Sequence, residues 1–168
     1  MQNQVAPAPM EAPTLIDRTS KLFIGGKQAR PDSGYSLPVR AADGRLIGEV
    51  GEGNRKDIRN AVEAAHAAES WAFTHGHSRA QILYYLAENL AVRAAEFAAR
   101  LHTLTGQEGS AEVEAAIKRL FTYAAWADKY DGLVHSTPLR GVVLAIPEPI
   151  GVIGILCPDE APLLSLIS

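Results

Sequence analysis

The sequence predicts an α/β fold in which short strands are followed by three helices and then by the start of a parallel sheet. Between residues 54 and 132, apolar side chains recur every three or four positions, as on the buried face of a helix. On both sides of this region, at 22–50 and 141–157, short runs rich in Val, Ile and Leu lie between Gly and Pro residues, as strands do.

The composition is that of one ordinary domain. The chain has 168 residues, 47% of them hydrophobic, which is enough for a core. The formal net charge of −3 gives no electrostatic basis for binding nucleic acid. No segment approaches the roughly 20 apolar residues that span a bilayer, and the first residues lack the features of a signal peptide. We therefore expect a soluble, cytoplasmic protein without nucleic-acid or membrane partners.

The segment before the helices is expected to contain a tail and three short strands. Residues 1–20, rich in Pro and Ala, predict a linker or disordered tail. The apolar run at 22–24, followed by two glycines, predicts a strand and a turn. The runs at 35–39 and 46–50 predict two further strands separated by a turn.

Three helices follow. Asn54 is the expected N-cap of the first, with Asp57 as a capping-box partner, and this helix is expected to end near Trp71. The second is predicted as one long helix over 79–105, because apolar residues recur along it on one face. Gly106 follows it as a stop signal. The third is predicted from Ser110 to about 132 and carries an aromatic set expected to pack against the second helix or a partner subunit: Phe121, Tyr123, Trp126 and Tyr130.

Two strands are expected after the helices. The β-branched run at 141–147 predicts the first, which the prolines on either side of Glu148 terminate. The run from Ile150 to Cys157 has no polar alternation, which favours burial on both faces in the manner of a central parallel strand.

Several local patterns have ordinary structural interpretations. Cys157, the only thiol, has apolar or acidic neighbours and is expected to be a buried strand residue rather than a nucleophile. The segment 48–53 does not complete a phosphate-binding glycine pattern, and the pair His75 and His77 is expected in an exposed loop. The sequence predicts no metal site.

The order of these motifs resembles the aldehyde dehydrogenase superfamily over roughly residues 20–168. Leu104-Thr105-Gly106-Gln107 followed by Glu112-Val113 is similar to the family's Glu-Thr-Gly-Lys and Glu-Val stretch. The run 149–158 is similar to its Pro-x-Gly-Val-x-Gly-x-Ile-x-Pro-Trp-Asn motif. Among its members, the chain looks most similar to the second, degenerate module of the double-length (family 16-like) proteins, because the Pro/Ala-rich start would suit the linker between their modules.

The resemblance implies an α/β fold that is the incomplete N-terminal portion of the aldehyde dehydrogenase fold: short strands, three helices and the start of a Rossmann-like parallel sheet. The dehydrogenase-like domain would occupy 21–168. Residues 139–148 would form an oligomerisation-type strand, and 150–168 would begin the cofactor-binding sheet. The implied partners are an aldehyde substrate in the full-length family and a second copy or another chain paired through strand edges.

The resemblance also implies a set of site residues. Leu156, Cys157, Pro158 and Asp159 would line the site of NAD or NADP. Glu160 falls at the family's oxyanion-binding Asn, where a hydrogen-bond donor is needed. An ionised carboxylate donates nothing, and the loss of one such donor costs about 2.7–4 kcal/mol of transition-state stabilisation. We therefore assign no catalytic residue.

The family's nucleophilic Cys, general-base Glu and glycine-rich cofactor turn would all follow Ser168. The first hypothesis is a fragment of an oxidoreductase that converts aldehydes to acids through a Cys thiohemiacetal, catalytically incomplete alone and without its own bound cofactor. The second is a non-catalytic pseudoenzyme or oligomerisation module, suggested by Asp159 and Glu160. The third, an unrelated helical binding protein, leaves the Gly-Val-x-Gly run unexplained.

Overall fold

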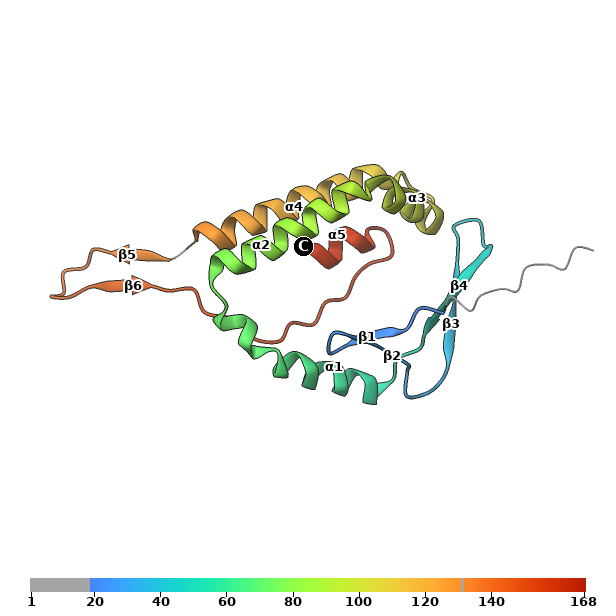
Figure 1. Cartoon of the computed structure of the whole chain (residues 1–168), viewed down its shortest axis with the longest axis horizontal. Coiled ribbons are helices and arrows are strands. Elements are labelled where there is room, and N and C mark those ends of the chain that lie inside the picture. Colours follow the sequence, from blue (N-terminus) through green and yellow to red (C-terminus); the bar gives the residue numbers. More distant parts are fainter. Residues whose placement is uncertain (1–18, 131) are drawn as a thin grey trace, which may run out of the picture.

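The computed structural model describes residues 19–130 and 132–168 (Figure 1). Most of the expected tail at 1–20 therefore lies outside the described residues. In chain order the elements are β1 (Leu22–Ile24), β2 (Lys27–Ala29), β3 (Ser36–Arg40), β4 (Leu46–Gly51), α1 (Arg55–Ala67), the 3-10 helix η1 (Glu69–Phe73), α2 (Gly76–Val92), α3 (Ala94–Thr105), α4 (Gly109–Lys129), β5 (Leu133–His135), β6 (Val143–Ala145) and α5 (Pro162–Ile167).

The described strands form three separate antiparallel hairpins: β1 with β2, β3 with β4, and β5 with β6. The predicted strands at 22–24, 35–39 and 46–50 are confirmed, whereas β2 and β5 were not predicted. An isolated parallel bridge between Ser20 and Val50 joins the first two hairpins. No Rossmann-like parallel sheet is seen in the described part of the chain, so that part of the fold prediction is wrong for these residues.

The N-terminus of α1 is held by a reciprocal cap. The Asn54 side chain accepts hydrogen bonds from the backbone of Lys56 and Asp57, and the Asp57 carboxylate accepts from the Asn54 N–H, as the sequence predicts. Asp57 is buried and also accepts from the Asp32 N–H, which fastens the loop after β2 to the helix. The hydrogen-bonded Lys56 ammonium holds the pKa of the Asp32 carboxyl below its usual value.

The predicted long helix over 79–105 is divided into α2 and α3. Arg93 lies between them with a non-helical backbone (φ −101°, ψ 13°), and its N–H donates to the carbonyls of Asn89 and Leu90. Its guanidinium pairs with Glu96 and lies 5.1 Å from the centre of the Phe97 ring. Because the break contains neither Gly nor Pro, no sequence signal marked it. Gly106 ends α3 in the left-handed region (φ 75°), as predicted.

The core lies among α2, α3 and α4. Its buried members are Ala87, Leu90, Leu101, Val113, Ala116 and Leu120. Small residues on the facing helices allow close approach, and Ala87, Ala116 and Ala124 are completely buried. The expected apolar stripes are only partly covered, because Ile58, Ile82 and other large side chains are exposed among the described residues.

The aromatic set on α4 packs as expected in part. The rings of Phe121 and Tyr84 lie 5.9 Å apart, which joins α4 to α2. Tyr123 and Trp126 contact one another at 5.8 Å, and the Tyr123 hydroxyl donates to the Ser168 carbonyl. Trp126 and Tyr130 are both 63% exposed, so this end of α4 keeps an apolar surface open.

Within 19–130 and 132–168, no helix combines the length and the apolar character that crossing a bilayer requires.

Substituting Gly109 should destabilise the helical core. An Ala Cβ at this position would lie 2.8 Å from the Leu101 Cβ and would collide with the Ala98 carbonyl oxygen. We expect Gly109→Ala to lower the free energy of unfolding by about 1–3 kcal/mol, measured by urea denaturation. The control is Gly48→Ala, since no described atom lies within 4 Å of that Cβ position. Equal stability of the two variants would contradict the close approach of α3 and α4.

Candidate functional site

The candidate site is the extended segment at 146–161, which joins β6 to α5. Figure 1 shows this segment returning from the β5–β6 hairpin between α1 and the helical core, and ending in α5, which contacts α4. All the residues expected to contact a cofactor lie on it.

The structure corrects the expectation of a buried strand at 150–157. None of these residues forms a strand, and every one of them is exposed. Leu156 is 99% exposed and Cys157 is also exposed, so the prediction of a buried cysteine is wrong. Pro158, Asp159 and Glu160 are likewise exposed.

The physical reason is the lack of a pairing partner in the described part of the chain. A strand buried on both faces needs neighbours that satisfy its backbone N–H and C=O groups and cover its side chains. No described strand pairs with residues 150–157. The apolar side chains of this segment would suit a central strand, but no described strand covers them. Ile150 is 90% exposed and Ile153 is 65% exposed.

One side of this segment faces α1 and η1 across a mainly apolar groove of about 620 Å³. Trp71, Phe73 and the end of α1 line one wall, and Pro149, Val152 and Ile153 line the other. This groove adjoins the first half of the segment, whereas the residues expected to contact a cofactor lie in the second half.

The second half is fixed by α5. Leu163, Leu164 and Ile167 of α5 pack against the core cluster. The Glu112 carboxylate of α4 accepts hydrogen bonds from the N–H groups of Leu163 (2.9 Å) and Leu164 (3.0 Å). At the other end, Arg119 donates to the Ser168 hydroxyl. Residues 156–160 are therefore held next to a helix that is anchored at both ends.

Sequence reasoning missed α5 and the role of Glu112 as its cap. Pro162 after Ala161 is a local signal for the first turn of a helix. The hydrogen bonds from Glu112 to α5 join residues more than 50 positions apart, and no local pattern marks such a contact.

The described residues do not by themselves fit a dinucleotide. Its pyrophosphate requires unoccupied backbone N–H groups at the start of a helix or in a glycine-rich turn. At α5, two of these groups already bind the Glu112 carboxylate. The exposed carboxylates of Asp159 and Glu160 would also repel phosphate. What the segment offers is an apolar wall formed by Leu156, Cys157 and Pro158.

The histidine pair lies at the start of α2. Both histidines are exposed, as expected, but only His75 lies outside a helix: it occupies the N-cap position of α2 without a side-chain capping bond, and His77 lies in the first turn. His77 Nδ1 lies 2.9 Å from Asp128 Oδ1, and hydrogen bonds from Lys129 and His77 hold the pKa of Asp128 below its usual value. Among the described residues, no cluster of three or more His, Cys, Asp or Glu is arranged to hold a metal ion.

Comparison with known proteins gives one family. The model of the aldehyde dehydrogenase family matches residues 31–168. The chain is 32% identical to rat mitochondrial aldehyde dehydrogenase over 94% of its own length and 32% of that protein. It is 34% identical to mouse retinal dehydrogenase 2 over 96% of its length and 32% of that protein. The chain thus spans about a third of the length of the curated relatives it matches.

A solved structure shares the fold. Betaine aldehyde dehydrogenase from Staphylococcus aureus, in complex with NAD+, superposes with a TM-score of 0.82 at 23% identity, covering 89% of this chain and 32% of that one.

Removing the Glu112 carboxylate should loosen the segment that carries the candidate site. In Glu112→Ala, two N–H groups of α5 lose their acceptor, a change that typically costs about 0.5–2 kcal/mol. We expect faster amide hydrogen exchange in residues 163–168, with the core of α4 unchanged. Glu114→Ala is the matched control, since Glu114 is exposed two residues along the same helix. Unchanged exchange at 163–168 would show that the cap does not hold α5.

Proposed function

Because the chain belongs to the aldehyde dehydrogenase family, we propose that it serves as the amino-terminal part of an oxidoreductase that converts aldehydes to carboxylic acids with NAD or NADP. The single observation that carries this proposal is the uncovered apolar run at 150–156, held at its end by the anchored α5. Such a run is suited to become the first strand of a cofactor-binding sheet when other strands pair with it.

In this proposal Leu156, Cys157, Pro158 and Asp159 form one wall beside the cofactor, and other residues of the parent protein hold its phosphates. The bound cofactor supplies hydride acceptance. This chain contributes orientation and exclusion of water through its apolar side chains, and α5 keeps that wall in place. The nucleophilic Cys and the general base come from elsewhere in the parent protein.

Glu160 supports a second candidate function. Its carboxylate stands where the resemblance places an oxyanion donor, and a carboxylate there opposes the developing negative charge. We therefore keep as the alternative a non-catalytic pseudoenzyme or assembly module, similar to the degenerate module of double-length members. The β5–β6 hairpin supports it, because all six of its strand residues are exposed and its outer edges are unpaired in the described chain.

The catalytic proposal predicts different behaviour of the chain alone and of its natural parent polypeptide. The 168 residues alone should produce no NADH from NAD+ and simple aldehydes, because the first N–H groups of α5 already bind Glu112 and no described strand pairs with residues 150–157 to complete a cofactor-binding sheet. The polypeptide captured from cells with an antibody to residues 19–168 should produce it, and mass spectrometry gives its length. NADH formation by the chain alone would overturn the first expectation, and an inactive natural polypeptide would favour the alternative.

The assembly alternative predicts an oligomer that depends on the β5–β6 hairpin. Leu144 is 54% exposed in β6, opposite Val134 of β5. We expect Leu144→Lys to lower the mass measured by light scattering from that of an oligomer to that of a monomer. If two hairpins pair, the lysine at 144 would be covered by the partner chain, and the charge would oppose this pairing. Val92→Lys, at a position 88% exposed at the end of α2, is the matched control. A wild-type chain that is monomeric at high concentration would exclude this assembly.

A further inference from the structure

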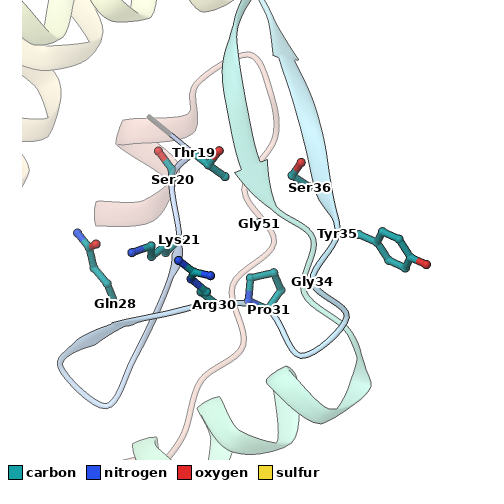
Figure 2. A pocket seen from close by; sticks show the side chains of 10 residues that line it. All are labelled: Thr19, Ser20, Lys21, Gln28, Arg30, Pro31, Gly34, Tyr35, Ser36 and Gly51. Atoms are coloured by element: carbon teal, nitrogen blue, oxygen red, sulfur yellow. The ribbon is translucent and has the colours of Figure 1, made fainter. Parts of the chain in front are cut away.

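A second surface, far in the sequence from the candidate site, is an open pocket of about 510 Å³ between the first two hairpins. It is lined by Thr19, Ser20, Lys21, Gln28, Arg30, Pro31, Gly34, Tyr35, Ser36 and Gly51. Figure 2 shows the side chains of Lys21, Gln28 and Arg30 gathered on the same side of the β1–β2 hairpin, whereas Tyr35 points away from them.

Backbone hydrogen bonds fix the base of this pocket. The Ser20 N–H donates to the Glu49 carbonyl (2.9 Å), and the Gly51 N–H donates to the Ser20 carbonyl (2.8 Å). The wall is tight at Gly51, where an added Cβ would lie 3.1 Å from the Pro31 ring. The entry to β1 is thus attached to the end of β4, so the residues just after Ser20 are held in place.

The β1–β2 register brings two cations together. Leu22 pairs with Ala29 and Phe23 with Gln28, so the next pair in the same register is Lys21 with Arg30. Since side chains alternate between the faces of a strand, Lys21, Gln28 and Arg30 lie on one face, and Lys27 lies on the other. Like charges directly opposite one another on a hairpin are destabilising unless something neutralises them.

No carboxylate neutralises this pair in the described part of the chain. The residues that line the pocket include neither Asp nor Glu. The ion pairs found among the described residues involve neither Lys21 nor Arg30. The nearby Glu49 carboxylate accepts a hydrogen bond from the Ser36 hydroxyl (2.6 Å). The pocket therefore presents two uncompensated positive charges beside the Gln28 amide.

We propose that this pocket binds a small phosphate dianion, free or as the phosphate group of a small metabolite. The Arg30 guanidinium supplies a planar fork of donors suited to two phosphate oxygens, and the Lys21 ammonium supplies a compact second charge. The Gln28 amide is a neutral donor for a remaining oxygen. The site is separate from the segment at 146–161 and does not depend on dehydrogenase activity.

The test is a titration of the 168-residue chain with inorganic phosphate, followed by amide chemical shifts at constant ionic strength. We expect saturable shifts at residues 20–21, 28–30 and 51. Lys21→Gln and Arg30→Gln should each weaken binding by at least about tenfold, because each removes a charge-assisted contact. Lys27→Gln, the same change of charge on the opposite face of the same hairpin, should leave the affinity unchanged.

Two further measurements keep the test decisive. Arg30→Lys keeps the charge and loses the planar fork, so its affinity should lie between those of the wild type and Arg30→Gln, and its dispersed spectrum would show that the hairpin is intact. A parallel titration with glycerol 3-phosphate shows whether the pocket prefers a phosphate monoester or the free ion, because the preferred ligand binds more tightly. Shifts that never saturate with either probe, or equal weakening by Lys27→Gln and Arg30→Gln, would overturn the proposal.

Discussion

The structure depends on the close packing of α2 against α4. The interface is built from small residues, since Ala80, Ala87, Ala116 and Ala124 are all almost completely buried. Small side chains let the two helices approach closely, and the large residues of the core then fill the space where α3 meets this pair. Each fully buried Leu or Val contributes about 1.5–3 kcal/mol, so a short list of side chains stabilises the helical part. Gly109 allows a second close approach, because its lack of a side chain lets the start of α4 lie against α3.

Hydrogen bonds to a carboxylate fix the starts of two helices, α1 and α5, that lie outside this interface. The Asn54 and Asp57 cap fixes the start of α1 and, through the Asp32 N–H, the loop after β2. The Glu112 carboxylate does the same for α5, which also packs apolar side chains against the core. In both places a carboxylate satisfies N–H groups that a helix start leaves without partners. Asp57 therefore holds the loop after β2, next to the polar pocket, against α1. Glu112 holds the start of α5, which follows the candidate site, against α4.

Sequence reasoning succeeded where the signal is local and failed where a partner decides the outcome. Asn54, Asp57 and Gly106 act through neighbours within a few positions, and their predicted capping roles are confirmed. The run at 150–157 has the composition of a buried strand, yet strand formation depends on another strand that the described residues do not contain. The break at Arg93 contains neither Gly nor Pro, so no local signal in the sequence marks it. The sequence therefore indicated which residues make up the candidate site, but it did not predict their exposure or the contacts that hold α5 beside them.

The uncovered surface at 142–156 and the polar pocket at Lys21 and Arg30 have different physical meanings. Apolar side chains as exposed as those of Val142, Ile150 and Leu156 gain free energy whenever another surface covers them, whatever its detailed sequence. Two opposed cations gain free energy only from an anion, and the geometry of the donors selects its shape. The first surface therefore favours association with more polypeptide, which agrees with a family whose matched members are about three times as long. The second favours a small charged ligand, and it would keep that property whether or not the apolar segment acquires its neighbouring strands.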